Sequence, residues 1–320
     1  MKTNPNKKRA PQNRTINLNG KEIPYLQKEL LILNEKSSYR KVKNKIINQP
    51  LEEAVKYLPA GFADLLFIDP PYNINKKFNK LNFKEMDFLD YENWFESWFV
   101  KLLPLLKNNA SVYVCGDWKT SHTILKTGMK YLTVRNRITW EREKGRGSKK
   151  NWKNCSEDIW FFTKSNDFTF NIDDVKLRRK VLAPYKDKSG KAKDWKRKGE
   201  FNFRDTFPSN IWTDISIPFW SMPENTEHPT QKPEKLLAKI ILASSNKGDT
   251  VFDPFAGSGT TAVVAKKLQR NFIAIEMDEY YSLLAQKRLN LADSDKEIQG
   301  YADGVFWERN TLQAQMKKKK

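Results

Sequence analysis

Hydrophobic positions along this chain form short apolar runs that alternate with amphipathic segments. The runs at 65–68, 110–115 and 271–275 are continuous and rich in branched or aromatic residues, which predicts buried strands. Residues 91–106 repeat their apolar positions every three or four residues, which predicts a helix. A second helix is expected at 260–269, after a glycine-rich turn. Alternating strands and helices indicate an α/β fold with a mostly parallel sheet.

Two more strands are predicted at 132–140 and 157–163, separated by a basic, glycine-containing loop. They pair most simply as antiparallel neighbours at one edge of the sheet. Residues 1–45 are polar and basic without a sustained period, and we expect a flexible arm there. Residues 75–90 predict a polar loop close to any site formed at residue 69.

The first of two chemically informative motifs follows the run 65–68, where residues 69–73 read Asp-Pro-Pro-Tyr-Asn. Proline fixes the backbone and leaves a carbonyl with no competing N–H. The corner therefore gathers the Asp69 carboxylate, the Pro70 carbonyl and the Tyr72 ring around one point. The two oxygens can accept the two N–H groups of a planar amine, and the ring can stack on the base that carries it. For the tetrapeptide alone, a turn capped by the aspartate is the structural alternative.

The second motif, at 250–261, reads Thr-Val-Phe-Asp-Pro-Phe-Ala-Gly-Ser-Gly-Thr-Thr. A strand, a glycine-rich turn and a helix start together form the entry of a nucleotide-type site. Gly257 and Gly259 let a ligand approach the backbone. Glu276, 23 positions after Asp253, stands where an acidic residue can hold two ribose hydroxyls. The missing third glycine disfavours a dinucleotide, and without Gly-Lys-Ser/Thr a Walker loop is excluded.

Together with residues 228–234, His-Pro-Thr-Gln-Lys-Pro-Glu, these motifs resemble those of the S-adenosylmethionine-dependent amino-methyltransferases of DNA. Their order, catalytic motif first and glycine-rich motif last, is similar to the circularly permuted beta group of restriction–modification enzymes. The resemblance covers about residues 46–292, with a variable stretch in the middle. It implies a Rossmann-like, doubly wound, mostly parallel and circularly permuted sheet with antiparallel edge strands, plus a target-recognition insert.

The resemblance also divides the chain into segments with expected roles. They are a basic flexible arm at 1–45, the catalytic half of the methyltransferase domain at 46–166, a target-recognition region at 167–225, the cofactor-binding half at 226–292 and a C-terminal tail at 293–320. The implied catalytic residues are Asp69, Pro70, Pro71 and Tyr72. The implied cofactor-binding residues are His228, Thr230, Lys232, Asp253, Phe255, Gly257, Ser258, Gly259, Thr260 and Glu276.

By this resemblance the methyl donor is S-adenosylmethionine and the acceptor is N6 of an adenine flipped out of the duplex. N4 of cytosine stays open as the acceptor, and so does an RNA base or a protein amide. A nucleic-acid-binding protein with an inactive site is the alternative from another class, against which the intact Asp69, Tyr72 and glycines argue. No metal is expected. A cognate restriction endonuclease is a candidate partner, and both monomer and homodimer remain open.

The charge distribution indicates the kind of partner. The formal net charge is +20, and residues 175–200 hold eleven basic residues against three acidic ones. Residues 1–45 hold twelve against three, and the chain ends in four lysines. Basic segments on a near-neutral body favour a polyanion, here double-stranded DNA, although a generally lysine-rich composition also explains the two ends. The residues expected to contact DNA are Lys176, Arg178, Arg179, Lys180, Lys196, Arg197 and Lys198.

The two cysteines exclude a cysteine-rich zinc site and argue against a secreted disulfide framework. With no apolar segment of signal or membrane-spanning type, a cytoplasmic protein without a membrane partner is expected. Cys115 lies in a strand-like run and Cys155 in a polar loop. Neither follows a proline, as the nucleophile of a cytosine-C5 methyltransferase does, which favours transfer to an exocyclic nitrogen.

Overall fold

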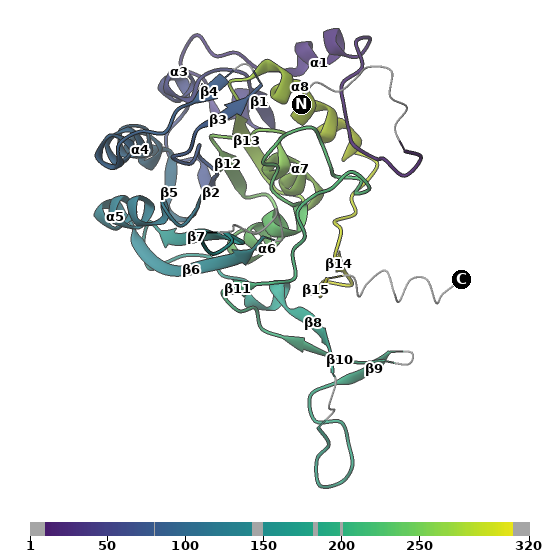
Figure 1. Ribbon diagram of the computed structural model, residues 1–320. Coiled ribbons are helices and arrows are strands. Elements are labelled where there is room, and N and C mark those ends of the chain that lie inside the picture. Colours follow the sequence, from purple (N-terminus) through teal and green to yellow (C-terminus); the bar gives the residue numbers. More distant parts are fainter. Residues whose placement is uncertain (1–9, 80, 143–149, 182–184, 199–200, 310–320) are drawn as a thin grey trace.

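The computed structural model describes residues 10–79, 81–142, 150–181, 185–198 and 201–309 of the chain. An eight-stranded sheet runs through the centre of the molecule, with helices on both of its faces (Figure 1). Within the described residues, no helix is both long enough and apolar enough to cross a membrane.

The strands of the central sheet lie in an order very different from their order in the chain. Across the sheet they are β1 (Lys45–Ile47), β13 (Asn271–Ile275), β12 (Thr250–Asp253), β2 (Ala63–Ile68), β5 (Leu106–Gly116), β7 (Ser156–Thr163), β6 (Thr133–Glu141) and β11 (Ile211–Trp212). Neighbours from β1 to β5 are parallel, and β7 is antiparallel to both β5 and β6. The predicted mostly parallel sheet with antiparallel strands near one edge is confirmed.

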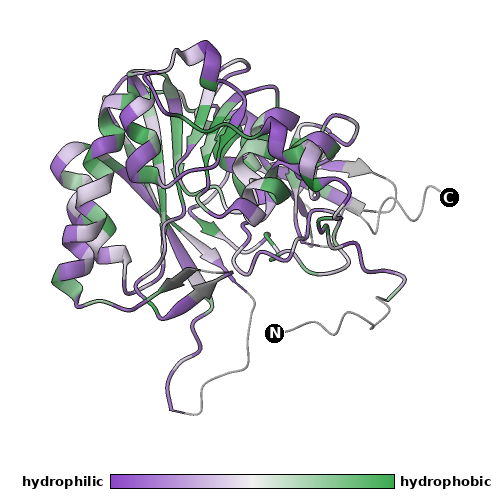
Figure 2. Cartoon of the chain, turned by 90° about the horizontal axis from the view of Figure 1, so that it is seen from above, coloured by the Kyte–Doolittle hydropathy of each residue, from purple (hydrophilic) through white to green (hydrophobic). Residues whose placement is uncertain are grey.

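Two helical layers bury the faces of this sheet. Along β2, Leu65 and Phe67 pack among residues of the layer formed by α6 (Glu234–Ser244), α7 (Thr260–Lys267) and α8 (Glu279–Leu291). Leu66 and Ile68 point to the opposite layer, formed by α4 (Phe88–Leu102) and α5 (Ser121–Tyr131). Because successive side chains of a strand alternate between faces, a continuous apolar run is what a strand buried on both sides requires. Figure 2 shows the hydrophobic residues gathered on the strands between the helices.

A second sheet of five strands projects from the central domain, and three of its strands come from the expected recognition region (Figure 1). Its order is β14 (Tyr301–Ala302), β15 (Val305–Trp307), β8 (Leu177–Lys180), β10 (Phe201–Thr206) and β9 (Lys196–Lys198). The expectation of a plain C-terminal tail from residue 293 was therefore wrong for 301–307. This segment is held because Trp307 is fully buried and packs edge-on against Phe203, with 5.6 Å between ring centroids.

The expected flexible arm is also wrong for the described residues 10–45. They form α1 (Ile23–Glu29), α2 (Tyr39–Val42) and the start of β1. Leu26, Leu33 and Val42 are buried, so isolated apolar residues of this segment find packing partners far along the chain. Lys287 of α8 adds a hydrogen bond to the Asn17 carbonyl at 2.7 Å.

The segment 75–90, expected as a polar loop, instead carries a short hairpin. Its strands are β3 (Lys76–Phe78) and β4 (Leu81–Phe83), and α4 begins within the same segment. The remaining short helical elements are α3 (Leu51–Ala54) and the 3-10 turns η1 (Val55–Tyr57), η2 (Leu103–Leu105) and η3 (Ile172–Val175). The Asn79 amide reaches Asp278 at 2.9 Å, so the tip of the hairpin touches the segment between β13 and α8.

Candidate active site

The two predicted motifs meet because β2 and β12 are parallel neighbours. Leu65 and Leu66 lie opposite Val251 and Phe252. The carboxyl ends of both strands therefore open at the same edge of the sheet, where ligands bind in doubly wound folds. A cavity of ≈ 370 Å³ lies at this edge. Its walls include all four expected catalytic residues, together with His228, Thr230, Lys232, Phe255, Gly257 and Glu276.

Asp69 is held through one of its two carboxylate oxygens. The Tyr72 hydroxyl donates to Asp69 Oδ1 at 3.1 Å, and Lys232 Nζ donates to the same atom at 2.6 Å. In the part of the chain that the structure describes, no hydrogen bond reaches Oδ2. The Tyr91 hydroxyl donates to the Pro71 carbonyl at 2.9 Å and thereby fixes the turn. Burial, together with the negative charge of Asp69, raises the pKa of Tyr72 well above its ordinary value, so the phenol is neutral.

Lys232 lies between two carboxylates. Its ammonium group is 2.6 Å from Asp69 Oδ1 and 3.3 Å from Glu157 Oε2. Burial works to lower the pKa of Lys232, but the charges of Asp69 and Glu157 outweigh it and raise that pKa. Lys232, which was expected among the cofactor-binding residues, therefore contacts the catalytic corner in this structure.

Sequence reasoning missed Glu157, which is 3% exposed at the start of β7. It lies on the same face of the strand as the buried Ile159 and Phe161, so its carboxylate occupies a position where the pattern calls for an apolar side chain. A carboxylate at an inward position is a signal that could have identified it, because buried charges are normally paired. Arg142 pairs with its other oxygen.

Gly257 and Glu276 form the part of the cavity expected to hold a cofactor. The Gly257 N–H donates to Glu276 Oε2 at 2.8 Å, and the Asp278 N–H donates to Oε1 at 2.8 Å. Gly257 has φ +52°, and a Cβ there would lie 2.9 Å from His228 Nε2. Only glycine fits this turn without strain. Burial raises the pKa of Glu276 to about 7, although both N–H bonds oppose that shift.

His228 is half-buried and neutral in this cavity. Burial lowers its pKa to about 3, and the positive charge of Lys232 acts in the same direction. Its ring packs edge-on against Tyr281, with 4.5 Å between ring centroids. The Thr230 N–H donates to His228 Nδ1 at 3.4 Å, so the loop that carries both residues is folded back on itself.

Four of the expected cofactor residues lie behind the cavity wall. Asp253 Oδ1 accepts the Phe255 N–H at 3.0 Å, and burial raises the pKa of Asp253 to about 7. Gly259 has φ +75°, and a Cβ there would meet the Ala285 Cβ at 2.5 Å, so this glycine lets α8 approach the turn. The other two, Ser258 and Thr260, are held from behind by a buried arginine.

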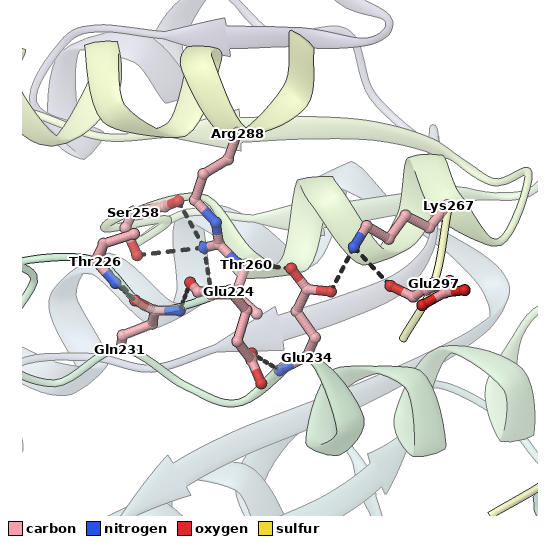
Figure 3. Close-up of polar contacts among 9 residues, drawn as sticks. All are labelled: Glu224, Thr226, Gln231, Glu234, Ser258, Thr260, Lys267, Arg288 and Glu297. Atoms are coloured by element: carbon pink, nitrogen blue, oxygen red, sulfur yellow. Dashed lines mark hydrogen bonds and ion pairs between the residues drawn. The ribbon is translucent and has the colours of Figure 1, made fainter. Parts of the chain in front are cut away.

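That arginine, Arg288, is the centre of the polar network in Figure 3. It is 2% exposed and donates to the Ser258 carbonyl and to Thr260 Oγ1, each at 2.9 Å. Its charge is balanced by Glu234 at 2.9 Å, which also pairs with Lys267 at 2.8 Å (Figure 3). The network thus ties the glycine-rich turn to α6, α7 and α8 at once.

The residues expected to contact DNA lie on two strands of the second sheet, β8 and β9, or directly before β8. Arg178 is tied by two 2.7 Å hydrogen bonds to Asp205 on the neighbouring strand, and Lys176 pairs with Asp173 at 2.7 Å. Arg179, Lys180 and Lys196 have exposed side chains, and Arg197 and Lys198 belong to β9.

Comparison with known proteins agrees with the geometry of the site. A family model described as DNA methylase matches residues 63–287. The DNA adenine methyltransferase YhdJ of Escherichia coli (strain K12) is 37% identical over 245 residues, which are 74% of this chain and 80% of that protein. The type II methyltransferase M.HpaI of Haemophilus parainfluenzae is 32% identical over 252 residues, or 78% of this chain and 73% of that protein.

Solved structures agree on the fold. The PvuII DNA methyltransferase (cytosine-N4-specific) has a TM-score of 0.56 at 18% identity, over 78% of this chain and 91% of that one. TTHA0409 of Thermus thermophilus, solved with S-adenosyl-L-methionine, has a TM-score of 0.52 at 16% identity, over 83% of this chain and 98% of that one. The family match covers well over half of the chain and includes the corner at Asp69 and the turn at Gly257. The chain therefore belongs to the DNA methylase family, and it is an S-adenosylmethionine-dependent DNA methyltransferase.

Proposed function

We propose that this enzyme transfers a methyl group from S-adenosylmethionine to N6 of adenine in a specific sequence of double-stranded DNA. The observation that carries the proposal is the shared cavity, which is lined by the Asp69 corner, by Gly257 of the glycine-rich turn and by Glu276. Adenine is favoured because the relative at 37% identity is named a DNA adenine methyltransferase. N4 of cytosine is the alternative that the assay must separate.

The cavity has the properties that S-adenosylmethionine requires. Its volume of ≈ 370 Å³ lies within the usual range of small-molecule sites. The Glu276 carboxylate would accept the ribose hydroxyls, and Gly257 leaves the main chain open to close approach. His228 is neutral, so it adds no positive charge to a cavity that must hold a sulfonium cation. The bound donor supplies an electrophilic methyl group on that sulfur.

The target amine is a poor nucleophile because its lone pair is delocalised into the base. Asp69 Oδ2 and the Pro70 carbonyl would each accept one of its N–H groups and favour a pyramidal nitrogen. Positive charge develops on that nitrogen as its lone pair bonds to the methyl carbon, and the Asp69 carboxylate stabilises this charge. The nitrogen then loses one proton, for which Asp69 Oδ2 is the acceptor, during or after methyl transfer.

An adenine inside a duplex cannot reach this cavity, so the base must flip out of the helix. The neutral Tyr72 ring lines the cavity beside Asp69 and would stack on the extruded base. Stacks of this kind contribute about 1–3 kcal/mol per base. The ring would thereby help to offset the cost of unpairing.

DNA would be held by the second sheet and the surrounding region 167–225, which we propose as the target-recognition region. Its exposed basic residues on β8 and β9 would contact phosphates, whereas base edges would be read by other side chains of the region. Because cellular DNA is the substrate, the enzyme would act in the cytoplasm. As a type II modification enzyme it would protect the site cut by a cognate restriction endonuclease.

The proposal is tested with Asp69→Ala and the matched surface control Asp90→Ala. DNA methylated by the wild-type enzyme is digested to nucleosides, and N6-methyladenine and N4-methylcytosine are quantified by mass spectrometry. We expect N6-methyladenine alone, a loss of at least about 10²-fold in Asp69→Ala, and donor affinity within a few-fold of wild type by calorimetry. Retention of more than about a tenth of the activity, or N4-methylcytosine as the product, would contradict the proposal.

A further inference from the structure

A chain of four charges, of which the middle two are buried, runs from the catalytic carboxylate after β2 past β7 to the residue that follows β6. Asp69 pairs with Lys232, Lys232 with Glu157, and Glu157 with Arg142 at the end of β6. Lys232 and Glu157 are 7% and 3% exposed. Burying charges in this way costs free energy, and replacing such pairs with apolar residues often stabilises a protein. Stability therefore does not explain why the charges stand beside the reacting group.

We propose that Glu157 and Lys232 are positioning residues, which fix Asp69 so that Oδ1 is occupied and Oδ2 faces the amine to be methylated. This inference rests on the proposed function of Asp69. It assigns Glu157 a part in methyl transfer that the sequence motifs do not include. It also places Lys232 with the catalytic corner rather than with the cofactor.

The argument begins with the freedom of a carboxylate. The terminal torsion of aspartate is broad and roughly two-fold, so an unsupported Asp69 could offer either oxygen at many angles. Two donors on Oδ1, from Lys232 at 2.6 Å and Tyr72 at 3.1 Å, remove that freedom. Because the same oxygen takes both donors, the other is left for the substrate.

Glu157 is needed because Lys232 is itself a long and flexible side chain. With Asp69 as its only carboxylate partner, the ammonium group could move toward Oδ2 and compete with the amine for it. Glu157 Oε2, at 3.3 Å, holds the ammonium from the other side. Arg142 occupies the remaining Glu157 oxygen and fixes that carboxylate in turn.

The charges also balance in a useful way. Asp69, Lys232, Glu157 and Arg142 together carry no net charge next to the place where the amine becomes positive. Without the Glu157 charge, the cations Lys232 and Arg142 would outnumber Asp69, and the local field would disfavour the cationic transition state. Orientation and electrostatics thus predict the same effect of removing Glu157, which is slower methyl transfer with unchanged binding.

The test compares Glu157→Gln and Lys232→Met with the control Glu141→Gln, a carboxylate on β6 that contacts neither Lys232 nor Asp69 among the described residues. Single-turnover methylation gives the rate, calorimetry gives the dissociation constant of S-adenosylmethionine, and 2-aminopurine fluorescence gives DNA binding and flipping. We expect Glu157→Gln to lower the rate by about 10- to 100-fold and Lys232→Met by at least as much. Both dissociation constants should stay within about threefold, and Glu141→Gln should match wild type.

Two results would overturn the inference. One is an unchanged rate in Glu157→Gln. The other is weakened donor binding in Lys232→Met with a normal rate at saturating donor, as expected if Lys232 held the donor carboxylate. Melting curves show whether Glu157→Gln is folded, and if it is not, Lys232→Met carries the same test. Asp69→Asn distinguishes a failure of the proposed function from a failure of this inference. A fully active Asp69→Asn refutes the proposed function, whereas an inactive Asp69→Asn beside a normal Glu157→Gln refutes only the positioning role.

Discussion

Replacing Arg288 with methionine should destabilise the protein and loosen the cofactor turn. The substitution keeps most of the side-chain volume but removes three hydrogen bonds of 2.9 Å, to Ser258, Thr260 and Glu234. Breaking a buried ion pair costs about 3–5 kcal/mol. Since Glu234 keeps Lys267 at 2.8 Å, we expect the lower end, about 3 kcal/mol. At about 2 °C per kcal/mol for a chain of this size, Tm should fall by about 6 °C.

The assay is thermal unfolding followed by circular dichroism, with and without saturating S-adenosylmethionine, alongside calorimetric donor binding. Donor affinity should weaken as well, because the Ser258 carbonyl and Thr260 hydroxyl lose the group that holds them. Lys41→Met is the control: its pair with Glu35 is exposed, at 42% and 73%, so Tm should change by no more than about 2 °C, equivalent to about 1 kcal/mol. If Arg288→Met melted like this control, the network in Figure 3 would not be what secures the turn.

Three further predictions concern donor and DNA binding. Because the pKa of Glu276 is about 7, donor affinity should be greatest above pH 7 and fall as the carboxylate is protonated below it, by at most about tenfold per pH unit; calorimetry from pH 6 to 8.5 should show a flatter profile for Glu276→Gln. Gly257→Ala forces a side chain into φ +52°, which costs about 1–2 kcal/mol, and brings its Cβ to 2.9 Å from His228 Nε2. Donor affinity should therefore weaken, and an unchanged affinity by calorimetry would remove this turn from the site. Neutralising Arg179 and Lys180 should lower the slope of log K against log salt by about 0.9 for each phosphate that is no longer neutralised by the protein, and titrations in which the slope stays the same would mean that both side chains face only solvent.

The elements that the sequence predicted correctly are those whose signal is local. The helix expected from Thr260 is α7, Thr260–Lys267, because the glycine-rich turn before it marks its start. The strand expected at 132–140 is β6, Thr133–Glu141, and its antiparallel partner is β7. In each case, alternation or a turn motif within about ten residues specifies the element.

Segments whose structure depends on distant partners were not predicted. Residues 301–307 carry a local hairpin signal, Asp303-Gly304 between two short apolar runs, which the prediction overlooked; that signal does not reveal that β15 also pairs with β8, more than 120 residues away in the chain. Residues 10–45 are ordered by contacts such as the isolated bridge of Ile16 with Thr226. Local propensity is too weak to reveal such pairings, since the free energy that orders each segment comes from a surface formed elsewhere in the chain.

Lys232 shows the same limit inside the site. Its position in the His-Pro-Thr-Gln-Lys-Pro string, shortly before the cofactor strand β12, suggested a contact with the cofactor, because neighbours in a motif are expected to share a ligand. However, β2 lies beside β12 in the sheet, so both motifs open into one cavity, and Lys232 lines that cavity together with the catalytic corner. Its ion pairs with Asp69 and Glu157 come from that adjacency. The chemistry requires β2 and β12 to be adjacent in the sheet, and they are adjacent although the order of their motifs along the chain is permuted.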